Sequence, residues 1–312
     1  MLKSTLLFLF LVGTHAFSAT EVITSLTDLA WATREIGGSL VEVKSLLKGP
    51  ENPHYVDAVP EFIRLASNAK VACMVGLDLE VGWMPKVLER SGNAQIQPGG
   101  KGYCETGKYI TVLEKPAGGV DRSMGDVHPS GNPHFWLSPK HLGQASRGIL
   151  EVLINVDPAN AAKYKAGYEA LLKKLSAIEE KSRARLQPLV ANHKGPILLE
   201  YHKEFAYFLE TYGLISQGSI EEKPGISPSA GRLAEVALGA KNSGVRFVLA
   251  ADTAPKKTLE RFAELSGLPI VQVPMSLNSK VTSYEEFQDL IVSSIIQKVA
   301  PKVAKNAFSA TH

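Results

Sequence analysis

The hydrophobic pattern alternates between short apolar runs and amphipathic segments along most of the chain. Three runs with strand character precede residue 92, and each is followed by a segment with helical spacing; the runs are "EVITSL", "LVEVKSLL" and "KVACMVG", and the segments are "TDLAWATREIGG", "PEFIRLASNA" and "GWMPKVLERSG". Four more apolar runs, also followed by helical patterns, come after residue 195: "PILLEYH", "LISQGSI", "VRFVLAAD" and "LPIVQVP". This alternation predicts mostly parallel sheets covered by helices.

Residues 158–190 have a different pattern. Ala, Leu, Lys and Glu dominate this segment, no glycine follows Gly167 in it, and apolar residues recur every three or four positions. These features predict one long helix that begins near Pro158. A surface helix of a single domain would also have this pattern, but its position between two strand–helix series favours a connector.

The predicted fold class is therefore α/β, with two lobes, each a mostly parallel sheet flanked by helices, joined by one long connecting helix. The expected boundaries are 20–157 for the N-terminal lobe, 158–190 for the connecting helix and 191–312 for the C-terminal lobe. A chain of 312 residues, 45% of them hydrophobic, has enough apolar content for two cores.

The first 19 residues have the pattern of a cleaved signal peptide. Lys3 supplies a short positive start, residues 6–12 ("LLFLFLV") form an apolar core, and small residues between Ala16 and Ala19 offer cleavage sites. The apolar core is too short to span a bilayer. Because no cysteine lies near the cleavage region, a lipid anchor is not expected. We therefore expect a soluble, exported protein.

Charge and cysteine content limit the function classes further. The net charge is +3, 21% of the residues are charged, and no basic run is interleaved with aromatic residues, which argues against nucleic-acid binding. In an oxidising compartment the pair Cys73 and Cys104 could form a disulfide. The alternative is that Cys73 is a buried thiol in a strand. No CxxC or Cys–His spacing indicates a cysteine-bound metal.

Histidines in loops carry the candidate chemistry. "DVHPSGNPHFWLSP" (126–139) holds His128 and His134 among prolines and glycines, which predict a shaped loop. His54 lies in a proline-rich loop after "LVEVKSLL", and His202 directly follows "PILLEY". Ligands of open α/β sheets bind beyond the carboxyl ends of strands. Because neutral imidazole is a good ligand for Zn²⁺, the loop positions of His54, His134 and His202 indicate a zinc site.

A carboxylate at another predicted strand end could complete such a site. Asp252 ends the run "VRFVLAAD". The alternative is that Asp252 caps the following helix, which Thr253 and Pro255 would open. The sequence leaves both interpretations open.

The remaining histidines are weaker candidates. His128 has three interpretations: an alternative ligand, a partner that orients His134, or a surface residue. His141 lies where a helix is expected to start, and His193 lies in the polar stretch "VANHKGP". Neither His141 nor His193 is expected to bind metal.

Four motifs carry a resemblance to a known family. "ENPHYVDAVPEF", "GNPHFWLSP", "LLEYHKEFAYF" and "EEKPGISPSAGRLAEV" resemble the zinc/manganese-type (cluster A-I, ZnuA-like) periplasmic solute-binding proteins of bacterial ABC transporters. The resemblance runs in the same order through nearly the whole mature chain, including the long helix. It implies that the two lobes hold one divalent ion between them, that an ABC permease in the inner membrane is the partner, and that the protein is not an enzyme. We expect a periplasmic monomer.

The resemblance assigns the first three metal ligands to His54, His134 and His202. Relatives then supply Asp or Glu from the C-terminal lobe or leave a water. Here the last strand end reads "VQVPMSLNS", without an acid, which leaves Asp252 as the candidate fourth ligand. Ser138 stands where many relatives have Asp after "FWL". The long His- and acid-rich loop of some zinc relatives is absent.

Three imidazoles favour Zn²⁺ as the bound cargo, whereas oxygen-rich sites suit Mn²⁺, which is the less favoured ion. The expected function is a high-affinity zinc receptor that delivers Zn²⁺ to the permease; a manganese or iron receptor of the same fold is the alternative. A zinc-dependent hydrolase with Glu200 or Glu204 as base is disfavoured, because neither HExxH nor GxSxG occurs. Since ligation needs neutral imidazole, binding is expected to weaken below about pH 6.5.

Overall fold

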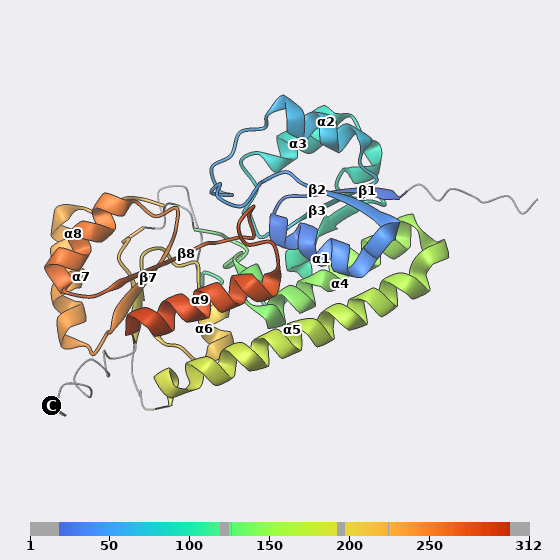
Figure 1. The fold of residues 1–312 in the computed structure, drawn as a ribbon. Coiled ribbons are helices and arrows are strands. Elements are labelled where there is room, and N and C mark those ends of the chain that lie inside the picture. The colour runs from blue at the N-terminus through green and yellow to red at the C-terminus, as the bar shows by residue number, and fades with distance from the viewer. Residues whose placement is uncertain (1–18, 119–124, 126, 192–196, 224, 300–312) are drawn as a thin grey trace, which may run out of the picture.

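The computed structural model describes residues 19–118, 125, 127–191, 197–223 and 225–299. These residues form two four-stranded parallel sheets, each flanked by helices, and one long helix runs along both (Figure 1). The predicted α/β class with two lobes and a long helix is confirmed. All but the last residue of the expected signal peptide, 1–19, lies outside the described residues, as does His193. In the part of the chain that is described, no helix is both long and apolar enough to cross a membrane.

The first lobe is built on a sheet with the strand order β2-β1-β3-β4, and all neighbouring strands are parallel. Its strands are β1 (Thr20–Thr24), β2 (Val41–Ser45), β3 (Val71–Met74) and β4 (Tyr103–Glu105). Its helices are α1 (Thr27–Gly37), α2 (Pro60–Asn68), α3 (Met84–Ser91) and α4 (Pro139–Val156). Helices α2 and α3 lie over one face of the sheet, and α1 and α4 lie over the other (Figure 1).

The second lobe repeats this plan with the strand order β6-β5-β7-β8, again all parallel. Its strands are β5 (Leu198–Glu200), β6 (Ser216–Ser219), β7 (Phe247–Ala251) and β8 (Ile270–Val273). Its helices are α6 (Ala206–Tyr212), α7 (Ala230–Asn242), α8 (Lys256–Ser266) and α9 (Tyr284–Val299). Every residue of β7 is buried, as expected for a central strand of a parallel sheet covered on both faces.

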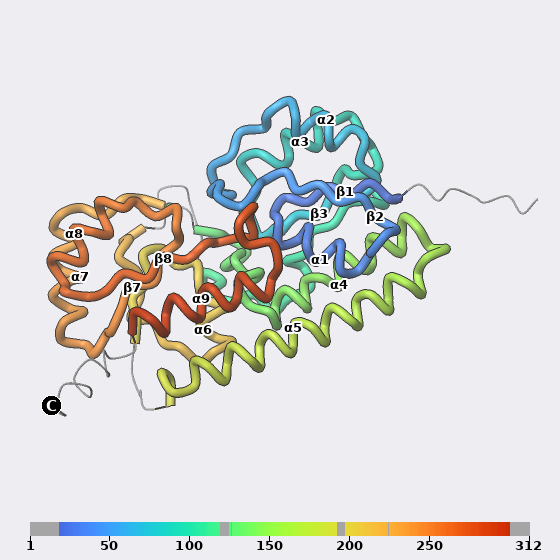
Figure 2. The backbone as a smooth tube through the Cα atoms, in the orientation of Figure 1, coloured from blue at the N-terminus to red at the C-terminus, as the bar shows by residue number. Residues whose placement is uncertain are grey.

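The long helix is α5, Ala161–Val190, and a single 3₁₀ turn at Pro158–Asn160 precedes it. At 1.5 Å per residue its length is about 45 Å. It packs against α1 and α4 of the first lobe and against α6 and α9 of the second, as Figures 1 and 2 show. The helix therefore forms one continuous side of the molecule beneath both sheets.

A second connection joins the lobes beside α5. After β8 the chain returns to the first lobe, where the Trp136 indole N–H donates to the carbonyl of Met275 at 2.6 Å. The Tyr284 hydroxyl donates to the carbonyl of Trp136 at 2.6 Å, and the Tyr284 ring stacks on Trp31 with centroids 5.2 Å apart. Because these groups are buried, separating the lobes here would leave polar atoms unpaired. This restrains the segment that follows His134.

Strand β4 was not predicted, because it is three residues long and lies in the glycine-rich stretch "GGKGYCETG". A Cβ at Gly102 would collide with the carbonyl of Lys70, so only glycine lets this strand approach β3. The pairing makes Cys73 and Cys104 register partners. Both are buried, and they lie opposite each other without a bridge in the structure.

The close packing of α5 on α1 depends on Gly167. A Cβ at this position would collide with the carbonyl oxygen of Ile36 at the end of α1. Helix propensity alone would make alanine more favourable than glycine by about 0.8–1.0 kcal/mol. We nevertheless expect Gly167→Ala to lower the free energy of unfolding by about 1–3 kcal/mol, because the helices must move apart. Urea titration measures this difference.

The matched control is Gly239→Ala in α7. No atom lies within 4 Å of a Cβ built at Gly239, so propensity acts alone and the variant should gain up to about 1 kcal/mol of unfolding free energy. An equal gain at Gly167 would contradict the packing described for α1 and α5.

Candidate metal site

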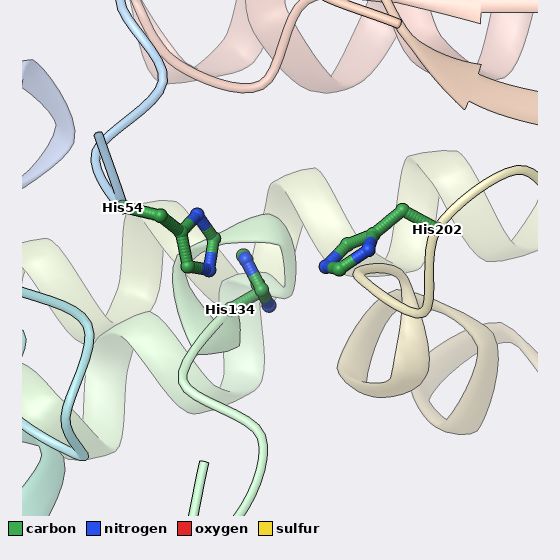
Figure 3. A group of neighbouring side chains, drawn as sticks. All are labelled: His54, His134 and His202. Atoms are coloured by element: carbon green, nitrogen blue, oxygen red, sulfur yellow. The ribbon is translucent and has the colours of Figure 1, made fainter. Parts of the chain in front are cut away.

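The three predicted histidines meet between the lobes, and each comes from a different loop (Figure 3). His54 follows β2, His134 precedes the short 3₁₀ helix Phe135–Leu137, and His202 follows β5. One ring nitrogen from each residue lies within 4.8 Å of the other two. The ring centroids are 5.2 Å apart for His54 and His134, 5.9 Å for His54 and His202, and 6.0 Å for His134 and His202. A single ion could contact all three.

Two of the histidines are presented by the same local motif, Asn-Pro-His. The Asn52 Oδ1 accepts the backbone N–H of His54 at 3.0 Å and lies 2.8 Å from its Nδ1. The Asn132 Oδ1 accepts the backbone N–H of His134 at 3.0 Å and lies 3.0 Å from its Nδ1. Such a turn, in which an Asn side chain bonds two residues ahead, is a known feature of Asn in loops, and the intervening proline fixes φ.

These contacts determine which ring nitrogen carries the proton. An atom that accepts a backbone N–H must be the amide oxygen, so the ring Nδ1 facing it must donate a hydrogen. The Nδ1 of His202 lies 2.8 Å from the Glu221 Oε2, and a carboxylate likewise only accepts. His54, His134 and His202 therefore hold their protons on Nδ1 and present the Nε2 lone pair, which is the arrangement of metal-binding histidines.

The Nε2 of His134 is buried and needs a polar or charged partner. His134 is 2% exposed, and its Nε2 has no hydrogen-bond partner among the described residues. Desolvation, with a smaller effect from the neighbouring imidazoles, lowers the pKa of His134 and of His54 well below the usual value. A buried polar atom without a partner is unfavourable. A cation would supply the partner that Nε2 lacks while the rings stay neutral.

A cavity of about 200 Å³ adjoins the three histidines. Its other lining residues include Glu51, Tyr55, Trp136, Tyr201, Glu204, Glu221 and Met275. This volume suits an ion with a few waters. Burial raises the pKa of Glu204 to about 7, and its carboxylate accepts the backbone N–H of Ala251 at 3.3 Å. Glu200 is buried too, with its pKa raised to about 7, and it accepts the backbone N–H of Phe205 at 3.0 Å.

Asp252 is not brought to the three histidines. It is exposed and does not line the cavity, and its backbone N–H donates to the carbonyl of Val273 at 2.8 Å. Nor is it the N-cap of the next helix, because α8 begins at Lys256 and Pro255 holds the N-cap position. Asp252 therefore follows strand β7 as the sequence predicts, but it is not part of the cavity lining.

Two other histidines, His128 and His141, lie outside the group of three. His141 lies in the first turn of α4, where a helix start was expected, and it is buried with its Nδ1 2.9 Å from the Ser138 hydroxyl. His128 does not orient His134, because Asn132 does so; instead its Nε2 lies 3.1 Å from the Nε2 of His54.

The residues that orient the imidazoles were missed from the sequence. The repeated "NPH" in "ENPHY" and "GNPHF" was a usable signal for Asn52 and Asn132, since the same tripeptide builds the same turn twice. Glu221 gave no such signal. It meets His202 only because β5 and β6 lie side by side.

Two α/β lobes on a long helix, with three Nε2 lone pairs converging between them, define a two-lobed binding protein with a candidate metal site. The chain belongs to the family described as "Zinc-uptake complex component A periplasmic" (ZnuA), whose model matches residues 22–298. Members of this family are substrate-binding proteins of metal ABC transporters and not enzymes.

Curated relatives differ in the metal that their names give. The chain is 26% identical over 256 residues to the "Iron ABC transporter substrate-binding lipoprotein MtsA" of Streptococcus pyogenes serotype M1, covering 80% of this chain and 77% of the relative. It is 25% identical over 214 residues to the "Manganese ABC transporter substrate-binding lipoprotein PsaA" of Streptococcus pneumoniae, covering 65% and 64%.

Solved structures share the fold. A crystal structure of ZnuA matches with a TM-score of 0.74 at 24% identity, covering 91% of this chain and 100% of that one. A cadmium-bound periplasmic metal-binding protein from Candidatus Liberibacter asiaticus matches with a TM-score of 0.73 at 18% identity, covering 90% and 99%. At these identities the two likenesses concern the fold alone.

The Asn-Pro-His turns make a testable contribution to metal affinity. Asn52→Ala removes the acceptor that holds the His54 Nδ1 proton while leaving the imidazole in place. We expect metal to bind about 10–100-fold more weakly, the scale set by outer-shell partners of metal ligands. Competition against a chromophoric chelator measures the change. Asn68→Ala is the control, because the Asn68 amide donates to the Arg64 carbonyl at an exposed position of α2. Equal affinities in both variants would contradict the role of the turn.

Proposed function

We propose that this protein is the zinc receptor of an ABC transporter, which captures one Zn²⁺ between its lobes through His54, His134 and His202 and delivers it to a permease in the inner membrane. The observation that carries the proposal is the shared tautomer of the three rings. This tautomer is supported by the acceptor that lies beside each Nδ1, and it leaves each Nε2 lone pair available to an ion where the three rings meet. The ion is cargo, so the site captures and releases it without chemical change.

The donor set supports zinc over manganese. Three neutral imidazole nitrogens suit a borderline-soft ion, whereas Mn²⁺ prefers carboxylate and carbonyl oxygen. The carboxylate nearest to the rings, that of Glu221, is engaged by the Nδ1 of His202 and by the backbone N–H of Gly225 at 2.8 Å. It therefore serves to orient a ligand.

A manganese or iron receptor is the second candidate. It is favoured by the buried carboxylates of Glu204 and Glu221 in the cavity lining and by the metals in the names of the iron and manganese relatives. If either carboxylate turned toward the ion, the site would gain an oxygen ligand that hard metals prefer.

We propose that the protein is a periplasmic monomer and that cleavage of its signal peptide releases it from the membrane. The support is the pattern of residues 1–19 and the absence of a cysteine near the cleavage region. The curated relatives reported above are named as lipoproteins, whereas this chain is proposed to carry no lipid anchor. Mass measurement of the exported protein tests this: a mature chain that starts near residue 20 without a lipid supports it, and a lipid-bearing or uncleaved chain overturns it.

Competitive titration tests the choice of metal. Wild-type protein freed of metal should bind one Zn²⁺ per chain, and added Zn²⁺ should displace Mn²⁺ and Fe²⁺. Tight Mn²⁺ binding that resists displacement by Zn²⁺ would support the second candidate and overturn the first.

The lowered pKa values shift the expected pH dependence. Protons compete with metal for Nε2, so a site with ordinary imidazoles would lose affinity below about pH 6.5. Because burial lowers the pKa of His54 and His134 well below that value, the competition begins at lower pH. We expect the zinc affinity to be nearly constant between about pH 7.5 and 6.5 and to fall only in more acidic solution. A tenfold loss already at pH 6.5 would contradict the assigned burial.

A further inference from the structure

A fourth imidazole lies against the three that converge. The Nε2 of His128 is 3.1 Å from the Nε2 of His54, and the His128 ring centroid lies 5.1 Å from that of His54 and 6.1 Å from that of His134. His128 also lines a second cavity, together with His202 and Asn132. His202 lines both this cavity and the first one, whereas His128 lines only the second of the two.

The contact between His54 and His128 requires a definite proton position. His54 holds its proton on Nδ1, which donates to Asn52, so its Nε2 can only accept. The hydrogen shared across 3.1 Å must therefore belong to the Nε2 of His128. The lone pair that His54 would give to a metal thus accepts the N–H of His128 in this structure.

The same distance fits two ligands of one ion. Two nitrogens at about 2.0–2.1 Å from a tetrahedral zinc are separated by about 3.3 Å. His128 and His54 are already at nearly this separation. For one ion to bind both nitrogens, His128 must carry its hydrogen on Nδ1 in place of Nε2, a change of tautomer that leaves the charge of the ring unchanged.

We propose that His128 is the fourth ligand of the metal held by His54, His134 and His202, so that the site binds its cargo through four neutral imidazoles. This rests on the proposed function. A site of four nitrogens keeps the full double charge of the ion and contains no oxygen, which favours zinc and disfavours manganese. His128 lies outside the group whose nitrogens are all within 4.8 Å of one another, so its ring must move toward His134 and His202 to share the ion.

The carboxylates offer weaker alternatives. Asp252 is exposed and does not line the cavity, and Glu221 already accepts from His202. Glu204 lines the cavity but accepts the backbone N–H of Ala251 at 3.3 Å. By contrast, the Nε2 of His128 lies 3.1 Å from the Nε2 of His54.

Cobalt substitution tests the proposal. Co²⁺ in place of zinc has a visible spectrum that reports the number and type of ligands, and a bound water reveals itself because it ionises, with a pKa of about 7–9 for zinc-bound water. With four imidazoles, the wild-type spectrum should not change between about pH 7 and 9. His128→Gln should admit a water, so its spectrum should become pH-dependent in that range and its affinity should fall at least about tenfold.

Two control variants isolate the fourth ligand. Asp252→Asn, at an exposed side chain that does not line the cavity, should leave both the spectrum and the affinity unchanged. Glu204→Gln tests the carboxylate alternative, and its spectrum should stay independent of pH if His128 is the fourth ligand; circular dichroism checks that all variants fold. A pH-dependent spectrum in wild-type protein, with no change in His128→Gln, would overturn the proposal, as would a pH-dependent spectrum in either carboxylate variant.

The test separates this proposal from the proposed function. If wild-type protein binds no cobalt or zinc, the receptor itself is refuted. If it binds metal tightly through three histidines and a water, the receptor stands and the role of His128 is refuted.

Discussion

Replacing His134 with alanine is expected to remove tight zinc binding while the protein still folds. A four-ligand zinc site contributes about 10–16 kcal/mol, so one ligand accounts for roughly 3–4 kcal/mol, or a factor of about 10²–10³ in affinity. His134 should reach at least that factor, because its Nε2 is buried and has no partner other than the ion among the described residues. Competition against a zinc chelator measures the loss.

His141→Ala is the matched control for this variant. Like His134, His141 is a buried histidine, 2% exposed, in the same part of the first lobe, but its ring bonds the Ser138 hydroxyl. Its loss should lower stability and leave the zinc affinity within a few-fold of wild type. If both variants lost zinc equally, the effect would come from packing, and His134 would no longer count as a ligand.

His202→Glu is expected to change the preference between metals. It replaces a nitrogen donor with an oxygen donor, which weakens the site for Zn²⁺ and strengthens it for Mn²⁺. We expect the ratio of zinc to manganese affinity to fall at least about 100-fold, which corresponds to about 2.7 kcal/mol. Because Glu221 lies against position 202, the substitution should be combined with Glu221→Gln to avoid placing two carboxylates together.

The control for this change in the ratio of zinc to manganese affinity is His202→Gln, also combined with Glu221→Gln. Glutamine removes the imidazole without adding a charge, so the affinity for both metals should fall and their ratio should change little. An unchanged ratio in the His202→Glu protein would show that the type of the third ligand does not set selectivity.

Much of the fold could be predicted because its signals are local. Strand and helix alternate in hydrophobic pattern, and the 30-residue helix α5 has the composition of a long helix from end to end. Strand β4 could not be predicted this way, since its three residues pair with β3 through the absence of a side chain at Gly102. The pairing of β4 with β3 depends on how closely the two backbones approach, and a hydrophobic pattern carries no information about this distance.

The site was predictable to the extent that strand ends are predictable. His54 and His202 follow strands, and residues at the carboxyl ends of parallel strands collect at one edge of a sheet. Asp252 also follows a strand, yet it is exposed and does not line the cavity. A strand end places a residue near the edge of the sheet but does not determine whether its side chain reaches the site. Glu221 and His128 reach the site through contacts between distant segments, so the sequence could not rank them.

The central claim is that one ion lies between the lobes and is held from both sides. Crystals of the zinc-loaded protein measured at the zinc absorption edge test it most directly. If the three histidines bind one zinc, we expect a single strong anomalous peak about 2.0–2.1 Å from the Nε2 atoms of His54, His134 and His202. A peak that contacts residues of one lobe only, or one that lies away from these three nitrogens, would contradict it.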